Sequence, residues 1–246
     1  MLTSPPKLQL EPTTRGGLLI WELPTQGRKY VIGVDTAHGL AKGDYAVCAV
    51  IDAETCTLVA RWREKCDPHV WGVKSALLGW FYNEALLAIE TFPSAHGVTA
   101  CMEAMRLGYR NIYKRQTQHT IARKQTDMLG WHTNVATKPM MIDRVKKALE
   151  DQSSYIFDED LLQELRTRSW NAKGQMEGPG NDDIFAAYAI ALMVRDQSWV
   201  QGKLRPDENL PMDYYSRYWR EWEKQVQRKA RPKPRRKPWT RRPPVL

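Results

Sequence analysis

The 246-residue chain is long enough to bury one sizeable core, and its 42% hydrophobic content favours one domain with tails over two large domains. It has neither a signal peptide nor an apolar run of the roughly eighteen residues that a membrane span needs, so we expect a soluble protein without a membrane partner. The four cysteines show no C-x-x-C spacing. This argues against a zinc knuckle or a disulfide framework and favours a reducing cytoplasm.

The net charge of +9 belongs to the C-terminal end of the chain. Residues 216–246 contain twelve Lys or Arg and two Glu, so the remaining residues are together nearly neutral. The segment is proline-rich and poor in aliphatic residues, which predicts disorder until it meets a polyanion or an acidic partner. A merely solubilising end is the alternative. The basic residues predicted to bind nucleic acid are Arg228, Lys229, Arg231, Lys233, Arg235, Arg236 and Lys237.

Strands dominate the N-terminal half. Tyr30–Asp35 predicts a strand, and residues 45–52 and 56–64 predict a hairpin that continues the same sheet, which gives three antiparallel strands. The Asp-Pro pair that opens residues 67–83 predicts a helix start, and the apolar residues inside follow helical spacing. Residues 85–90 then predict a short buried strand that ends, like the first, in an acid.

The second half alternates further. It predicts a helix at about 94–107, a short strand at 111–115, a polar connection at 116–138, a helix from near Pro139, a strand at 154–157 and a helix at 158–168. Near the end, "EGPGNDDIFAAYAIALMV" places Asn181 as an N-cap before an almost wholly apolar helix, which must be buried. Upstream, "GGLLIWELP" is a candidate edge strand.

Acids occur where three of these elements begin or end. Taken singly, Asp35 suits an Asx turn, Glu90 an ordinary strand end, and the Asp182–Asp183 pair a helix dipole. If the first and fourth strands are neighbours, however, their carboxyl ends open on one edge, and a helix N-terminus there would add a third carboxylate. Such clustered anions are tolerated mainly beside a divalent cation, and oxygen ligands favour Mg²⁺ or Mn²⁺ over zinc.

Four segments resemble the nuclease domain of the large terminase subunit of tailed bacteriophages. They are "GVDTAHGLAKGDYAVCAVID", "LLAIETFPSAHGVTACMEAMRLGYRNIYKR", "GWHTNVATKPMMIDRVKKAL" and "GPGNDDIFAAYAIALMV", and they occur in the order of that family. The resemblance implies an α/β fold of the RNase H-like kind, in which a mixed sheet of three antiparallel strands followed by parallel strands is flanked by helices. The corresponding domain would be residues 29–200, with 1–28 as an arm or linker and 201–246 as an aromatic helix and basic tail.

The resemblance also implies site residues. Asp35, Glu90 and Asp183 would be catalytic and would hold two Mg²⁺ or Mn²⁺ ions; Asp182 is an alternative ligand to Asp183, and Asp44 would be a further ligand or would hold a ligand in place. Further expected DNA contacts are Lys138, Arg123 and Lys124, for which an ordinary solvated surface is the alternative.

The function implied is metal-dependent cleavage of double-stranded DNA, with little sequence specificity, during viral genome packaging in the host cytoplasm. The chain has no G-x-x-x-x-G-K-[ST] motif, so we expect the packaging ATPase on a separate chain, with the portal or the small terminase subunit as further partners; a chain that is a fragment or a remnant is the alternative. Another RNase H-like nuclease, such as a junction resolvase, and a non-catalytic DNA-binding or assembly protein are the alternatives.

Overall fold

The computed structural model describes residues 17–37, 45–92, 95–119, 124–151, 153–167, 169–170, 176–177 and 182–199. Within these ranges no helix is both long and apolar enough to cross a membrane. The expected aromatic helix and basic tail at 201–246 lie outside the described residues.

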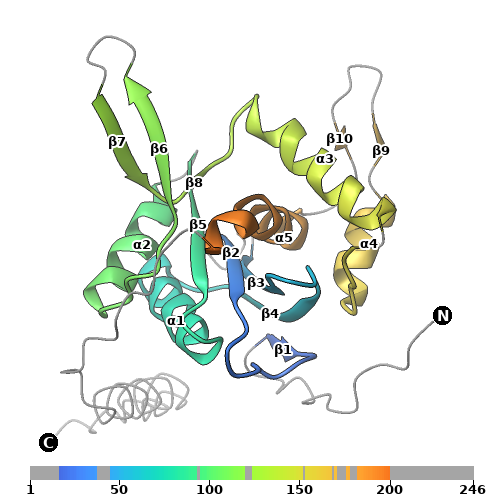
Figure 1. Ribbon diagram of the computed structural model, residues 1–246, viewed down its shortest axis with the longest axis horizontal. Coiled ribbons are helices and arrows are strands. Elements are labelled where there is room, and N and C mark those ends of the chain that lie inside the picture. The colour runs from blue at the N-terminus through green and yellow to red at the C-terminus, as the bar shows by residue number, and fades with distance from the viewer. Residues whose placement is uncertain are drawn as a thin grey trace, which may run out of the picture. The chain divides into compact units, whose positions relative to one another are not determined.

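A six-stranded mixed sheet forms the centre of the fold (Figure 1). Its strands, in spatial order, are β1 (Leu18–Ile20), β4 (Leu58–Glu64), β3 (Ala46–Asp52), β2 (Tyr30–Asp35), β5 (Leu86–Phe92) and β8 (Trp131–His132). Neighbours from β1 to β2 run antiparallel, whereas β5 pairs in parallel with both β2 and β8. The predicted sheet of three antiparallel strands followed by parallel ones is therefore confirmed, and β1 is the expected edge strand. The domain boundaries at 28 and 200 stay a prediction.

Helices cover both faces of this sheet (Figure 1). On one side lie α1 (Pro68–Phe81) and α2 (His96–Arg106), and on the other lie α3 (Thr137–Glu150), α4 (Glu159–Thr167) and α5 (Asp183–Val194), which a short 3₁₀ helix, η1 (Arg195–Trp199), continues. The sequence pattern explains α5, because a helix apolar on every side can only be stable inside a core. It packs directly on β2 and β3.

A row of small residues allows α5 to approach the sheet. Gly33 of β2 lies between its register partners Ala49 and Ala88, so the three residues face the same side of the sheet. A Cβ atom on Gly33 would lie 1.9 Å from the carbonyl oxygen of Ala187 in α5. No side chain larger than hydrogen fits there, and this contact fixes the height and position of α5 over the sheet.

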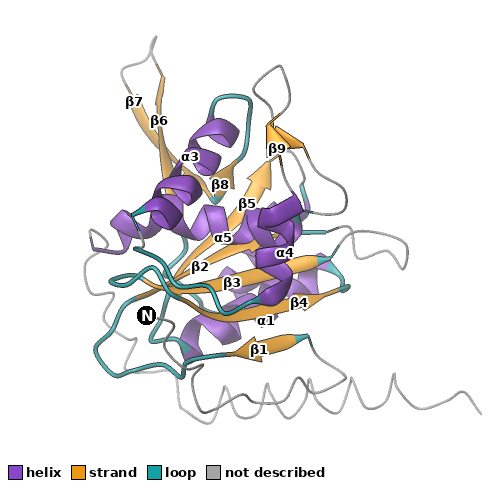
Figure 2. Cartoon of the chain, turned by 90° about the vertical axis from the view of Figure 1, so that its right-hand side faces the viewer, coloured by secondary structure: helices purple, strands orange, loops and turns teal. Residues whose placement is uncertain are grey.

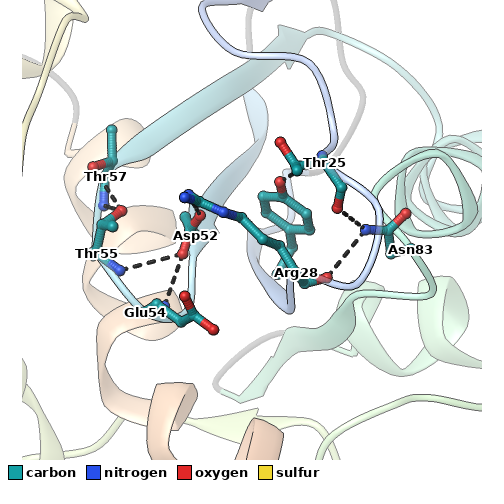
Figure 3. Close-up of polar contacts among 8 residues, drawn as sticks. Thr25, Arg28, Asp52, Glu54, Thr55, Thr57 and Asn83 are labelled. Carbon is teal, nitrogen blue, oxygen red and sulfur yellow. Dashed lines mark hydrogen bonds and ion pairs between the residues drawn. The ribbon is translucent and has the colours of Figure 1, made fainter.

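Polar side chains form a hydrogen-bond network where β2 begins and β3 ends. The carboxylate of Asp52 accepts hydrogen bonds from the backbone N–H groups of Glu54 (2.8 Å) and Thr55 (3.2 Å), and it pairs with Arg28 at 2.6 Å (Figure 3). Asn83 donates to the carbonyl oxygens of Thr25 and Arg28. This network joins the entry to β2 to the β3–β4 turn.

The structure corrects two predictions. The polar connection contains a hairpin of β6 (Lys114–His119) and β7 (Lys124–Leu129), which projects from the sheet (Figure 2). Its strands contain few apolar residues, so the sequence lacks the apolar–polar alternation that would have predicted them. Of the strand predicted at 111–115, Ile112 makes an isolated bridge to Leu87, whereas Lys114 and Arg115 begin β6, and Lys114 also bridges to Gly130.

The strand predicted at 154–157 is wrong. This segment is extended but irregular, and its backbone contact with the strands is the hydrogen bond from Leu58 N to Tyr155 O. Ile156 and Phe157 instead pack against the core, whereas Tyr155 is exposed, and β1 occupies the open edge of β4. A second small hairpin, β9 (Ser169–Trp170) and β10 (Met176–Glu177), precedes α5.

Candidate active site

A single row of side chains crosses the sheet on the face that α5 covers. The register pairs Asp35 with Val47, and Val47 with Arg63. It also pairs Val34 with Ile89, which places Glu90 directly beside Asp35 at the carboxyl ends of two parallel strands. Because register partners face the same side of a sheet, the two carboxylates are neighbours.

Helix α5 brings a third acid to the same edge. Ala187 lies over Gly33, and Asp183 lies one helical turn earlier, in the direction in which β2 runs towards Asp35. Asp183 is buried, with 6% of its surface exposed. We call Asp35, Glu90, Asp182 and Asp183 the acid cluster.

The other acids of the cluster influence the electrostatics of Asp35. Burial raises the pKa of Asp35 well above its usual value, and the negative charges of Glu90 and Asp183 raise it further. Part of the Asp35 residue nevertheless stays accessible to solvent. The hydrogen bond between the side chains of Asp35 and Glu90 raises the pKa of Asp35 and lowers that of Glu90, so Asp35 is the donor and Glu90 the acceptor.

Glu90 has a second polar neighbour. Burial raises the pKa of Glu90, while hydrogen bonds from Thr133 and Asp35 counteract this effect. Thr133 opens the "TNVATKP" segment, which runs into the first turn of α3, so this segment contacts the acid cluster through its first residue as well as through Lys138.

Two basic side chains lie at opposite sides of the acid cluster. Arg63 of β4 places its Nη2 atom 3.9 Å from Asp183 Oδ2, and Lys138 of α3 places Nζ 3.8 Å from Asp182 Oδ2. The backbone N–H of Tyr45 also donates to Asp183 Oδ2, at 3.3 Å. Positive groups thus partly offset the charge of the acids.

The donor chemistry of the acid cluster fits a hard divalent cation. Its carboxylates supply only oxygen ligands, and their mutual repulsion is what a bound cation would relieve. In the described part of the chain, however, no group of three or more His, Cys, Asp or Glu side chains is positioned to hold one ion. Asp183 Oδ2 is directed to Tyr45 N and Arg63 instead, so ligation would require the carboxylates to reorient.

The other predicted site residues have different positions. Asp182 occupies the N-cap position of α5, without a capping hydrogen bond from its side chain, and is more exposed than Asp183. Lys124 lies in β7. Asn181, Asp44, Arg123 and the basic residues of the tail lie outside the described residues.

Sequence reasoning missed two residues that the structure brings to this edge. Arg63 follows from the hairpin register once the turn after Asp52 is known, because the alternation of β4 puts Arg61 and Arg63 on one face. Glu164 of α4 accepts a hydrogen bond from Phe185 N in the first turn of α5. No local pattern marks Glu164, since its partner lies on another helix.

Solved structures share this fold. Neither the protein-family models nor the curated proteins gave a match. The large terminase nuclease from thermophilic phage G20c with bound cobalt is 20% identical, with a TM-score of 0.56 over 73% of this chain and 88% of that chain. Its structure with bound magnesium gives the same values, and a further one contains bound zinc. The Thermus phage P74-26 large terminase nuclease domain is 21% identical, with a TM-score of 0.52 over 73% of this chain and 86% of that chain.

At this level of identity the comparison shows the fold. The chain has the mixed α/β architecture of the large terminase nuclease domains, which is RNase H-like. The resemblance that the four sequence segments predict is thereby confirmed for the fold.

Proposed function

We propose that the chain is a metal-dependent endonuclease that cuts double-stranded DNA, with little sequence specificity, during viral genome packaging. The observation that carries the proposal is the convergence of Asp35, Glu90 and Asp183 at one edge of the sheet, although they are distant in the sequence. The bound cobalt, magnesium and zinc of the similar nuclease domains support a divalent metal cofactor.

In this proposal the acid cluster would hold two Mg²⁺ or Mn²⁺ ions, and its members would have different roles. Asp35, at the centre of the row, would serve both ions, Glu90 would hold one and Asp183 the other, with Asp182 as the alternative ligand. Bound there, the ions would activate the attacking water and stabilise the departing 3′ oxygen of the phosphodiester. A proton that the raised pKa of Asp35 retains would have to leave when the metal binds, because a carboxylate and not a carboxylic acid is the ligand.

The remaining residues position the DNA. Thr133 orients Glu90 through its hydrogen bond, and Lys138 lies where it can contact a backbone phosphate next to the acid cluster. Contacts to phosphates do not distinguish bases, so they suit cleavage at many sequences. The basic tail, a packaging ATPase on another chain, and the portal or small terminase subunit stay proposals from the sequence.

Cleavage of supercoiled plasmid by the full chain tests the proposal. We expect nicked and linear products with Mg²⁺ or Mn²⁺, none with EDTA, and a loss of rate of at least about a hundredfold in Asp35→Asn. Asp196→Asn is the matched control, because Asp196 is an exposed acid that pairs with Arg144 and Arg195. Intact DNA binding without cleavage by the wild type would instead favour the non-catalytic alternative, and preferential cutting of four-way junctions would favour a resolvase.

A further inference from the structure

Two cationic side chains share one aromatic ring beside the acid cluster. The guanidinium carbon of Arg63 lies 4.3 Å from the centroid of the Tyr45 ring, and Lys65 Nζ lies 4.8 Å from the same centroid. Both distances fall within the range of cation–π attraction. Tyr45 is itself 36% exposed, so this group of three residues lies at the surface and not in the core.

Arg63 is held in place more firmly than a surface arginine usually is. Its backbone belongs to the sheet, its guanidinium stacks on Tyr45, and three quarters of its side chain is covered, the exposed fraction being 25%. Its Nε atom is buried and has no hydrogen-bond partner among the described residues. Its distance of 3.9 Å from Asp183 is too long for a hydrogen bond, so the carboxylate attracts the guanidinium without satisfying it.

The order of the strands places the basic groups on two sides of the acids. Arg63 lies near the end of β4, two strands from β2, and Lys65 directly follows β4, whereas Lys138 follows β8 on the opposite side of β5. A phosphodiester backbone that approached the carboxylates alone would be repelled. A DNA strand lying across the acid cluster would meet a positive charge before it and another after it.

We propose that Tyr45, Arg63 and Lys65 form a binding site for one backbone phosphate of DNA, adjacent to the phosphate that is cut. The planar guanidinium of Arg63 is suited to two parallel hydrogen bonds with phosphate oxygens, and the Tyr45 ring holds its plane. Lys65 adds a second charge without demanding a fixed geometry. The inference rests on the proposed function for its substrate, but its test does not depend on cleavage.

The test measures binding of a fluorescent 20-base-pair duplex to the full chain with Ca²⁺ in place of Mg²⁺, at several salt concentrations. We expect Arg63→Ala to weaken binding roughly tenfold and to reduce the slope of log K against log salt by about one phosphate contact. Arg63→Lys restores the slope but only part of the affinity, because it keeps the charge and loses the fork. Arg106→Ala is the control, since Arg106 is exposed on α2 and paired with Glu103.

A titration with Mn²⁺ in the absence of DNA separates this role from a purely structural one. The phosphate site predicts unchanged or tighter Mn²⁺ binding in Arg63→Ala, because a cation next to Asp183 has been removed. A wild-type salt slope in Arg63→Ala, or a loss of Mn²⁺ binding that accounts for the weaker DNA binding, would overturn the inference. A wild-type chain that binds DNA with the expected Arg63 effect but never cleaves plasmid would remove the proposed function and leave the phosphate site standing.

Discussion

Glu164 of α4 provides the first turn of α5 with a cap that α5 does not provide for itself. Its Oε2 atom accepts a hydrogen bond of 2.8 Å from the backbone N–H of Phe185. Asp182, at the N-cap position, makes no capping bond with its side chain. A negative charge at this helix N-terminus is favourable in itself, and Glu164 adds one from another helix to those of Asp182 and Asp183. The carboxylates of Asp182 and Asp183 are therefore not used to cap α5, and they contact Lys138 in the case of Asp182, and Arg63 and Tyr45 N in the case of Asp183.

Loss of this cap should weaken metal binding more than overall stability explains. We expect Glu164→Ala to lower the free energy of unfolding by about 1 kcal/mol, as for other lost caps, and to reduce Mn²⁺ affinity severalfold because the start of α5 frays. Glu164→Gln keeps an acceptor oxygen and should restore most of both. Calorimetric titration and urea unfolding measure the two effects, with exposed Gln163→Ala on the same helix as control. Wild-type Mn²⁺ affinity in Glu164→Ala would contradict the positioning role.

Gly33 should tolerate no side chain. In Gly33→Ala the new Cβ would meet the Ala187 carbonyl oxygen at 1.9 Å, so α5 must move away from β2. We expect a loss of about 3 kcal/mol or more in the free energy of unfolding, together with weaker metal binding, since Asp183 moves with α5. Gly27→Ala is the control: nothing lies within 4 Å of its Cβ, and only its φ of +83° is strained, which costs about 1 kcal/mol. Equal effects of the two substitutions would argue against the close approach.

Asp52 should affect stability but not the acid cluster. The residue is 1% exposed, and its register partner is Tyr30 at the start of β2, whereas Asp35 ends that strand. Asp52→Ala leaves Arg28 and two backbone donors without their acceptor (Figure 3), which should cost about 1–3 kcal/mol. Mn²⁺ affinity at a temperature where the variant is folded should equal that of the wild type. A matching fall in Mn²⁺ affinity would show that the two ends of β2 are coupled.

Buried thiols should make the protein less stable in alkali. Burial raises the pKa of Cys48 and of Cys101 to about 12, whereas a thiol in the unfolded chain ionises near about 8.5. Between these values the unfolded state binds fewer protons, so the free energy of unfolding falls as the pH rises, by up to about 1.4 kcal/mol per pH unit for each thiol. Urea midpoints between pH 8 and 10 measure this slope.

The variant Cys101→Ala measures how much Cys101 contributes to this pH dependence of stability. Cys101→Ala should be less sensitive to alkali than the wild type, whatever its stability at neutral pH. Because the folded protein keeps these thiols protonated, alkylating reagents at pH 8 should modify Cys48 and Cys101 only after unfolding. Rapid labelling of both in the folded protein would contradict their burial.

The sequence predicted the parts of the fold that local patterns specify. The strands that end in Asp35 and Glu90 and the apolar helix after Asp182 follow from periodicity, and their convergence follows from the parallel pairing of β2 and β5. The hairpin of β6 and β7 was not predicted because its strands contain few apolar residues. The wrong strand at 154–157 is apolar and short, so its pattern could not tell pairing from burial.

The residues of the candidate site likewise fall into those that local sequence patterns predict and those that depend on tertiary packing. Acids at the ends of elements are visible in a sequence, and their shared edge follows from topology. Arg63 needed the hairpin register, and Glu164 needed the packing of α4 on α5, which no spacing along the chain encodes. The orientation of the carboxylates depends on close packing of α5 on the sheet. A single added Cβ atom at Gly33 would already disturb this packing.

The double role of α5 has a consequence for how the molecule matures. The same helix fills the centre of the core and delivers Asp183, and it comes from the last part of the sheet-bearing unit to be synthesised. A nascent chain that ends before residue 183 has the strands with Asp35 and Glu90 but neither the third acid nor the helix that packs over them. In the proposed nuclease, chemistry that needs all three acids would therefore be withheld until folding is complete, which would protect nearby nucleic acid during synthesis without any inhibitor.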